Sequence, residues 1–186
     1  TRINSLMWNA EDGFYYDLDA AERQIPTKTI GGYWPLLAEI PNEDRSERMI
    51  AHLKDPSAFG TEHPFPTLAA GHPDYDKKGG GYRGSVIPPF TYMVIKGLEK
   101  YNQYEMARDC AIRHLYFVLD SMYQNGEQKP TIWEAYQPQN EGKAVWADRP
   151  EWPRPQFLPY TGLSTVALMI ENIVGLSVSL PRKTVD

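Results

Sequence analysis

Apolar residues recur at intervals of three and four in several separate parts of the sequence, which predicts a mainly α-helical chain. We expect helices after Asn42, from Pro88 or Pro89, from about Tyr104 to Gln124, and from about Leu163 to Leu176. Two long segments, 55–86 and 127–161, lack this spacing and are rich in Pro, Gly, Trp and Tyr. The chain therefore alternates helices with unusually long loops.

Loops of this length are uncommon in a compact domain unless they have a function. Antiparallel helices joined by short turns at one end and by long loops at the other are typical of a helical toroid with its binding cleft on the loop face. No repeat of fixed period is visible, which argues against a short-repeat solenoid. Short β-prone runs at 13–17 and 27–30 predict a small β-hairpin.

The composition narrows the possible partners. The chain has 186 residues and a net charge of -5, and no cluster of Lys or Arg alternates with the aromatic residues, so nucleic acid is a poor partner. The most apolar stretch, 166–176, is too short to cross a bilayer, so we expect a soluble chain, with its compartment left open. His63 and His72 lack ligand spacing, and we expect neither a metal nor a cofactor. Cys110 lies on a helical apolar stripe and is expected to be a buried thiol.

The hexapeptide 131–136 places the carboxylate of Glu134 between Trp133 and Tyr136. Aromatic faces stack on the C–H surfaces of a sugar ring, while a carboxylate binds its hydroxyls or activates water for glycosidic cleavage. The alternative is ordinary packing of aromatic side chains beside a solvated charge. The hexapeptide alone leaves both interpretations open.

Six sequence blocks in one order carry a resemblance to a known family. They are 8–17 (WNAEDGFYYD), 28–37 (KTIGGYWPLL), 63–67 (HPFPT), 81–89 (GYRGSVIPP), 133–136 (WEAY) and 160–163 (YTGL). Nearly the whole chain resembles the C-terminal half of the (α/α)6-barrel of glycoside hydrolase family 63 and of the related family 37 trehalases. The resemblance implies that residues 1–186 form a single domain that is the C-terminal part of such a barrel.

The resemblance implies an inverting mechanism, in which one carboxylic acid protonates the leaving oxygen and a second carboxylate activates water. Glu134 matches the general base, with Tyr136 nearby as an orienting hydrogen-bond group. The general acid of the family is an Asp in the first half of the barrel, and no segment here matches it. We therefore expect the isolated chain to be inactive.

The same resemblance suggests contacts with the substrate. Arg83 resembles the arginine that reaches the sugar next to the cleavage point, and Gly84 would allow close backbone approach; a salt bridge that locks the loop is the alternative for Arg83. The candidate walls of the pocket, each of which could instead belong to the core, are Tyr33, Trp34, Phe65, Tyr82 and Trp133. Trp146 and Trp152 could form an outer subsite or close the loop.

The function expected from these residues is that of an inverting, glucosidase-like α-glycosidase whose substrate is an oligosaccharide or a disaccharide. A trehalase or a mannosylglycerate-type hydrolase is a nearby alternative. A non-catalytic carbohydrate-binding or scaffolding helical module is an alternative of another class. Because half a toroid exposes apolar helix faces, we expect the chain to pair with the N-terminal half of the barrel or with itself.

Overall fold

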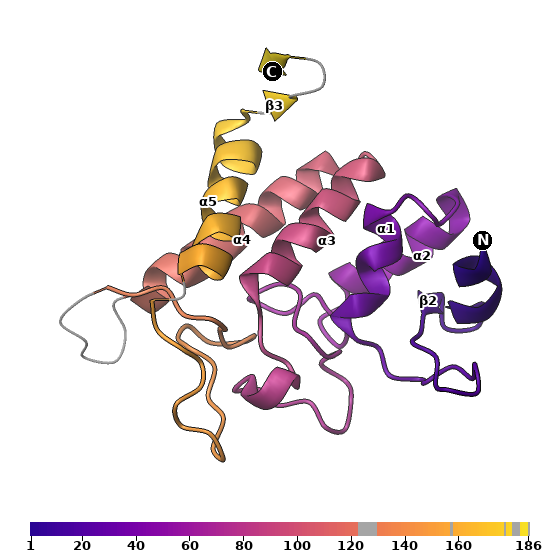
Figure 1. Cartoon of the computed structure of the whole chain (residues 1–186), viewed down its shortest axis with the longest axis horizontal. Helices are drawn as coiled ribbons and strands as arrows, with labels where there is room; N and C mark the ends of the chain where they lie inside the picture. Colours follow the sequence, from indigo (N-terminus) through magenta and orange to yellow (C-terminus); the bar gives the residue numbers. More distant parts are fainter. Residues whose placement is uncertain (123–129, 157, 177, 180–182, 186) are drawn as a thin grey trace.

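A computed structural model describes the chain except for residues 123–129, 157, 177, 180–182 and 186 (Figure 1). Its α-helices are α1 (Trp34–Leu37), α2 (Glu43–Lys54), α3 (Pro88–Lys100), α4 (Tyr104–Met122) and α5 (Leu163–Leu168). Shorter 3-10 or π-helical turns are η1 (Ile3–Met7), η2 (Ile30–Tyr33), η3 (Gly80–Tyr82), η4 (Leu158–Gly162) and η5 (Met169–Val174). The strands are β1 (Trp8–Asn9), β2 (Phe14–Tyr15), β3 (Val178–Ser179) and β4 (Thr184–Val185).

Helix α2 begins where the sequence predicts. The Asn42 side chain accepts a hydrogen bond from the backbone N–H of Arg45 at 3.2 Å, which satisfies one of the free donors of the first turn. Glu43 and Asp44 place negative charge at the positive end of the helix dipole. The buried stripe that includes Met49 then packs against the core.

Helices α3 and α4 form a helical hairpin. Pro88 occupies the first position of α3, where a missing N–H costs nothing, and residues 101–103 make the short turn to α4. The two helices pack along each other (Figure 1). The predicted stripe of α4, which includes Cys110 and His114, is buried. The predicted stop signal of α4 at 125–126 lies outside the described residues.

The last predicted helix forms in two parts. Helix α5 continues as the π-helical turns of η5, which end at Gly175 in the left-handed conformation (φ 84°). Lys96 of α3 pairs with Glu171 of η5 at 2.7 Å and with Glu99 at 3.0 Å. This ion-pair network fixes the C-terminal helix on the α3–α4 hairpin.

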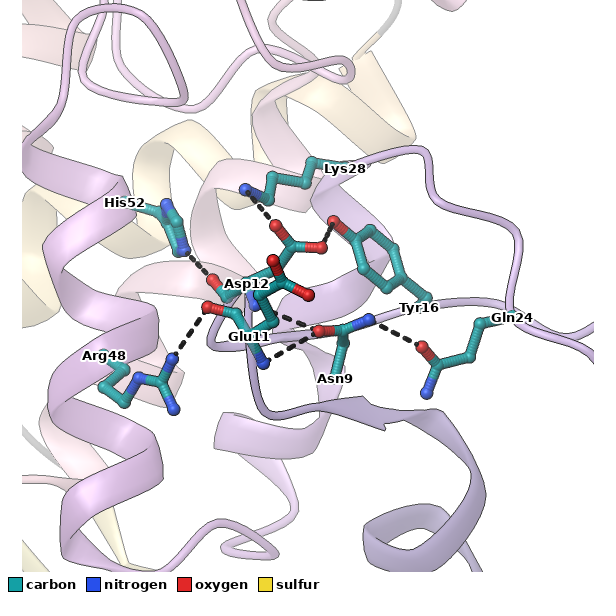
Figure 2. Close-up of polar contacts among 8 residues, drawn as sticks. All are labelled: Asn9, Glu11, Asp12, Tyr16, Gln24, Lys28, Arg48 and His52. Atoms are coloured by element: carbon teal, nitrogen blue, oxygen red, sulfur yellow. Dashed lines mark hydrogen bonds and ion pairs between the residues drawn. The ribbon is translucent and has the colours of Figure 1, made fainter.

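The predicted hairpin between 13–17 and 27–30 is wrong. The antiparallel partner of β2 is β1, whereas Thr29 bridges Leu68 of the first long loop. The side chain of Asn9 accepts hydrogen bonds from the backbone of Glu11 and Asp12, both at 3.0 Å, and so folds the chain back between β1 and β2 (Figure 2). Local side-chain bonds set this turn, which the β-prone composition of 27–30 does not reveal.

Aromatic side chains from three parts of the N-terminal half meet in the main core. The rings of Phe14, Tyr33 and Phe59 lie 5.2–5.9 Å apart and are fully buried. Around them the core is formed by residues of α1, α2, α3 and α4. Among the described residues, no helix combines the length and the apolar character needed to span a bilayer.

One face of the helices remains exposed and apolar. A groove between α4, α5 and η5 is lined mostly by apolar side chains, and those of Tyr116, Leu119, Val166 and Met169 are exposed. Water contact with apolar surface is unfavourable, and exposed apolar surfaces often mark sites where another polypeptide binds. The pairing of this face with another polypeptide stays a prediction.

Residues 1–186 expressed alone are therefore expected to self-associate, as measured by multi-angle light scattering. The double variant Leu119→Lys/Val166→Lys should lower the apparent mass, because it places two charges in the groove. The matched control is Ile25→Lys, which changes an exposed apolar residue outside the groove and should leave the mass unchanged. A monodisperse wild-type monomer would contradict this expectation.

Candidate active site

Glu134 lies in the segment 131–136, which pairs with the end of the loop before α3. Val86 and Tyr136 exchange both of their backbone hydrogen bonds at 2.9 Å, which ties the segment 131–136 to the start of α3. The Tyr136 hydroxyl accepts a hydrogen bond from the backbone N–H of Trp133 at 3.0 Å. Tyr136 thus orients the backbone next to Glu134, and no direct bond joins its hydroxyl to the Glu134 carboxylate.

The carboxylate of Glu134 forms a bidentate ion pair with Arg154. The Arg154 Nε donates to Oε2 at 3.0 Å and Nη2 donates to Oε1 at 2.9 Å. These side-chain hydrogen bonds lower the pKa of Glu134 below its usual value, against the opposing effect of burial. Glu134 is only 8% exposed and is ionised at neutral pH.

A hollow of about 240 Å³ lies beside this carboxylate. Its lining consists of Tyr82, Glu134, Trp146, Arg149, Glu151, Trp152 and Arg154. The rings of Trp146 and Trp152 are 5.8 Å apart and perpendicular, and the ring of Tyr82 is 6.0 Å from that of Trp152. The hollow therefore combines three aromatic faces with two cations and two carboxylates, which suits a ligand with both C–H surfaces and hydroxyl groups.

The loop around η3 forms one wall of the hollow. Gly81 has a positive φ of 60°, and a Cβ there would lie 3.0 Å from the Trp146 ring. The ring of Trp146 therefore packs directly against the backbone of Gly81. Tyr82 is 53% exposed and presents its ring to the hollow. Gly84 has φ 131°, and its backbone N–H donates to Thr67 Oγ1 at 3.1 Å.

Arg83 lies on the exposed surface of the same loop. Its Nε reaches the carbonyl oxygen of Gly80 only at 3.5 Å, and it forms no ion pair with any residue that the structure describes. The alternative of a salt bridge that locks the loop is therefore not seen. The guanidinium remains available to a ligand, although it is not part of the lining of the hollow.

The other predicted wall residues lie elsewhere in the structure. Tyr33 and Phe65 are fully buried in the main core, and Trp34 packs against Phe90 with ring centroids 5.6 Å apart. Trp133 is buried with Tyr136 and Val118 of α4. These side chains do not line the hollow around Glu134, and their contact with a sugar stays a prediction.

Three charged residues of the hollow were not singled out by the sequence: Arg149, Glu151 and Arg154. All three lie in the Pro-rich segment after Trp146, where the only available signal is the mixture of Trp, Pro and Arg. Trp146 and Trp152, predicted as an outer subsite or a loop closure, both face the hollow.

Two histidines form a buried pair next to the ring of Tyr136. His63 Nε2 lies 2.8 Å from His114 Nδ1, and His63 Nδ1 lies 3.2 Å from the carbonyl oxygen of Gln137. Burial lowers the pKa of both side chains, that of His114 to about 3, so the pair is neutral. The described part of the chain holds no group of three His, Cys, Asp or Glu side chains placed to bind a metal.

The sequence also matches a known family. The sequence profile of the mannosylglycerate hydrolase MGH1-like glycoside hydrolase domain matches residues 1–149. The chain belongs to this MGH1-like family. An uncharacterized protein of Borreliella burgdorferi is 48% identical over 185 residues, which are 99% of this chain and 39% of that protein. The chain thus spans about two-fifths of the length of this curated relative.

Solved structures share the fold of this MGH1-like domain. The GH63 mannosylglycerate hydrolase of Thermus thermophilus, in complex with Tris and D-glycerate, has a TM-score of 0.65 at 21% identity, covering 89% of this chain and 35% of that one. Neutral trehalase of Saccharomyces cerevisiae has a TM-score of 0.63 at 15% identity, covering 91% and 28%. These neighbours are helical toroids, which confirms the predicted fold class of a mainly α, partial (α/α)6 toroid with long loops. The small β-hairpin is present, but β1 and β2 form it instead of the predicted runs 13–17 and 27–30.

Proposed function

We propose that this MGH1-like domain carries the general base of an inverting α-glycosidase, and that Glu134 is this base. The observation that carries the proposal is a buried, ionised carboxylate on the wall of an aromatic hollow. A general base must be deprotonated before the reaction starts, and its oxygen must reach the attacking water. Glu134 meets the first requirement, and its place in the lining of the hollow serves the second.

The general acid of this proposed reaction comes from outside the chain. Inversion needs the two carboxyl groups roughly 6.5–9.5 Å apart so that water fits between the base and the sugar. Glu151 is a second carboxylate in the lining, but it is exposed, whereas a general acid is usually shielded from solvent. Asp12 accepts a hydrogen bond from the Tyr16 hydroxyl and pairs with Lys28 (Figure 2). It is not part of the lining of the hollow.

The proposed substrate is an α-linked disaccharide or oligosaccharide. Tyr82, Trp146 and Trp152 offer ring faces to a sugar. Arg83, the exposed residue that follows Tyr82 in the sequence, is proposed to donate to the hydroxyl groups of the sugar. The structural neighbours include a mannosylglycerate hydrolase and a trehalase, so substrates of both kinds belong in the screen. Helices from the remainder of a longer protein are proposed to complete the cleft and to cover the apolar groove of α4.

A non-catalytic sugar-binding or scaffolding module is the second candidate. The observation that favours it is the bidentate ion pair, because Arg154 engages both oxygens of Glu134. In a scaffold, the ion pair between Glu134 and Arg154 would stay formed at all times. Such a module would bind sugar through the aromatic rings and would not hydrolyse it.

The anomeric configuration of the first product tests the proposal. The complete protein, incubated with an α-linked substrate and followed by proton NMR, is expected to release the β-anomer first and the α-anomer later by mutarotation. Inversion gives this order, because water attacks the face opposite the leaving group. Initial release of the α-anomer would contradict the proposed mechanism, and no hydrolysis of any screened glycoside would favour the binding module.

A further inference from the structure

We propose that Arg154 is a positioning residue that fixes the orientation of the Glu134 carboxylate and holds it as a carboxylate. This inference rests on the proposed role of Glu134 as the base. Arg154 lies beyond residues 1–149, which the family profile matches, so the inference comes from the contacts in this chain.

The Arg154 side chain is exposed and the Glu134 side chain is largely buried, and the contact between the two residues includes more than one ion pair. Besides the two side-chain hydrogen bonds, the backbone N–H of Arg154 donates to Glu134 Oε2 at 3.3 Å, and the backbone N–H of Glu134 donates to the Arg154 carbonyl oxygen at 3.0 Å. The backbone N–H of Gln156 donates to Thr131 Oγ1 at 2.9 Å and extends the attachment. The segments around residues 134 and 154 are therefore joined by contacts that include the carboxylate of Glu134.

The planar guanidinium determines the plane of the carboxylate. A bidentate pair aligns both groups, which a single-point contact does not. A carboxylate has about four lone-pair positions, two on each oxygen. Oε2 accepts two hydrogen bonds from Arg154 and Oε1 accepts one, so Oε1 keeps a position for a water molecule. Arg154 and Glu134 both line the hollow, so the fixed carboxylate presents an edge to it.

The other groups around Glu134 do not replace this interaction. Arg149, Glu151 and Tyr82 line the same hollow, and Tyr160 lies within electrostatic range of Tyr82. The interactions that lower the pKa of Glu134 come from Arg154, which donates three hydrogen bonds to its carboxylate. Loss of the guanidinium should therefore raise the pKa of Glu134, because burial then acts without opposition from the side chain.

The pH dependence of hydrolysis by the complete protein tests this role. In Arg154→Gln, the acid limb of the kcat/KM profile is expected to move to higher pH by roughly 1–2 units, the usual effect of losing an adjacent opposite charge. Arg154→Lys keeps the positive charge without the bidentate geometry. Its acid limb should therefore lie between those of the wild type and of Arg154→Gln. The control is Arg108→Gln, an exposed arginine on α4 outside the hollow, which should leave the limb in place.

The backbone bonds between residues 134 and 154 do not depend on the side chain of Arg154, so the loop should keep its place; circular dichroism verifies the fold. An unmoved acid limb in Arg154→Gln, with Glu134→Gln inactive, overturns the positioning role and leaves the proposed function intact. A raised KM with an unmoved limb also overturns it, because Arg154 would then bind substrate directly. Full activity of Glu134→Gln removes both the proposed function and this inference.

Discussion

Replacing Glu134 by Gln is expected to lower hydrolysis by the complete protein by roughly 10²–10⁴-fold, the usual contribution of a general base. The amide has nearly the shape of the carboxylate but cannot accept a proton from water. The sugar should still bind, because the ring faces of Tyr82, Trp146 and Trp152 are unchanged. We therefore expect the dissociation constant of an unhydrolysed ligand, measured by calorimetry, to change by only a few-fold.

Glu47→Gln is the matched control, since Glu47 is an exposed glutamate on α2 outside the hollow. Its hydrolytic rate should equal that of the wild type. If Glu134→Gln hydrolyses as fast as the wild type, Glu134 is not the base. If binding and hydrolysis fall together, Glu134 contributes to the affinity for the sugar and not to the chemical step alone.

Gly84→Ala is expected to lower the free energy of unfolding by roughly 2–5 kcal/mol, through backbone strain and overpacking together. Gly84 has φ 131°, a conformation that residues with a Cβ rarely adopt. An added Cβ would lie 2.7 Å from the backbone oxygen of Asp76 and 2.7 Å from the Tyr75 ring. Because one of these atoms belongs to the backbone, the contact cannot be relieved by turning a side chain.

Gly175→Ala separates the two causes. Gly175 also has a positive φ, 84°, but a Cβ there would meet no atom within 4 Å. Urea denaturation should show a loss of about 1 kcal/mol for this variant, from the backbone conformation alone. Equal losses in the two variants would show that the close approach of Asp76 and Tyr75 to Gly84 is unimportant.

The helices could be predicted from the sequence because their signals are local. Asn42, Pro88 and the apolar stripe of α4 each act within a few residues of their own position, and the structure confirms the helices that they predict. The pairing predicted between 13–17 and 27–30 is wrong, because β2 pairs with the neighbouring β1 and Thr29 pairs with the distant Leu68. Pairing between distant residues depends on the packed core and leaves no spacing in the sequence.

Part of the candidate site could be predicted from the sequence and part of it could not. The block around Glu134 can be found in the sequence, since a carboxylate between aromatic residues is contiguous. Arg154 lies twenty residues later and reaches Glu134 only in the folded chain. Likewise, whether Trp133 or Trp152 faces the hollow depends on packing: Trp133 fills the space beside Val118, whereas Trp152 stands against Trp146.

The proposed function requires that a glycoside bind in the hollow beside Glu134. The most direct measurement is a crystal structure of the complete Glu134→Gln protein with an unhydrolysed α-linked disaccharide. We expect a sugar ring against Tyr82 and Trp152, with a water molecule between residue 134 and the anomeric carbon. A sugar bound at another surface, with this hollow empty at saturating ligand, would contradict the proposed function of Glu134.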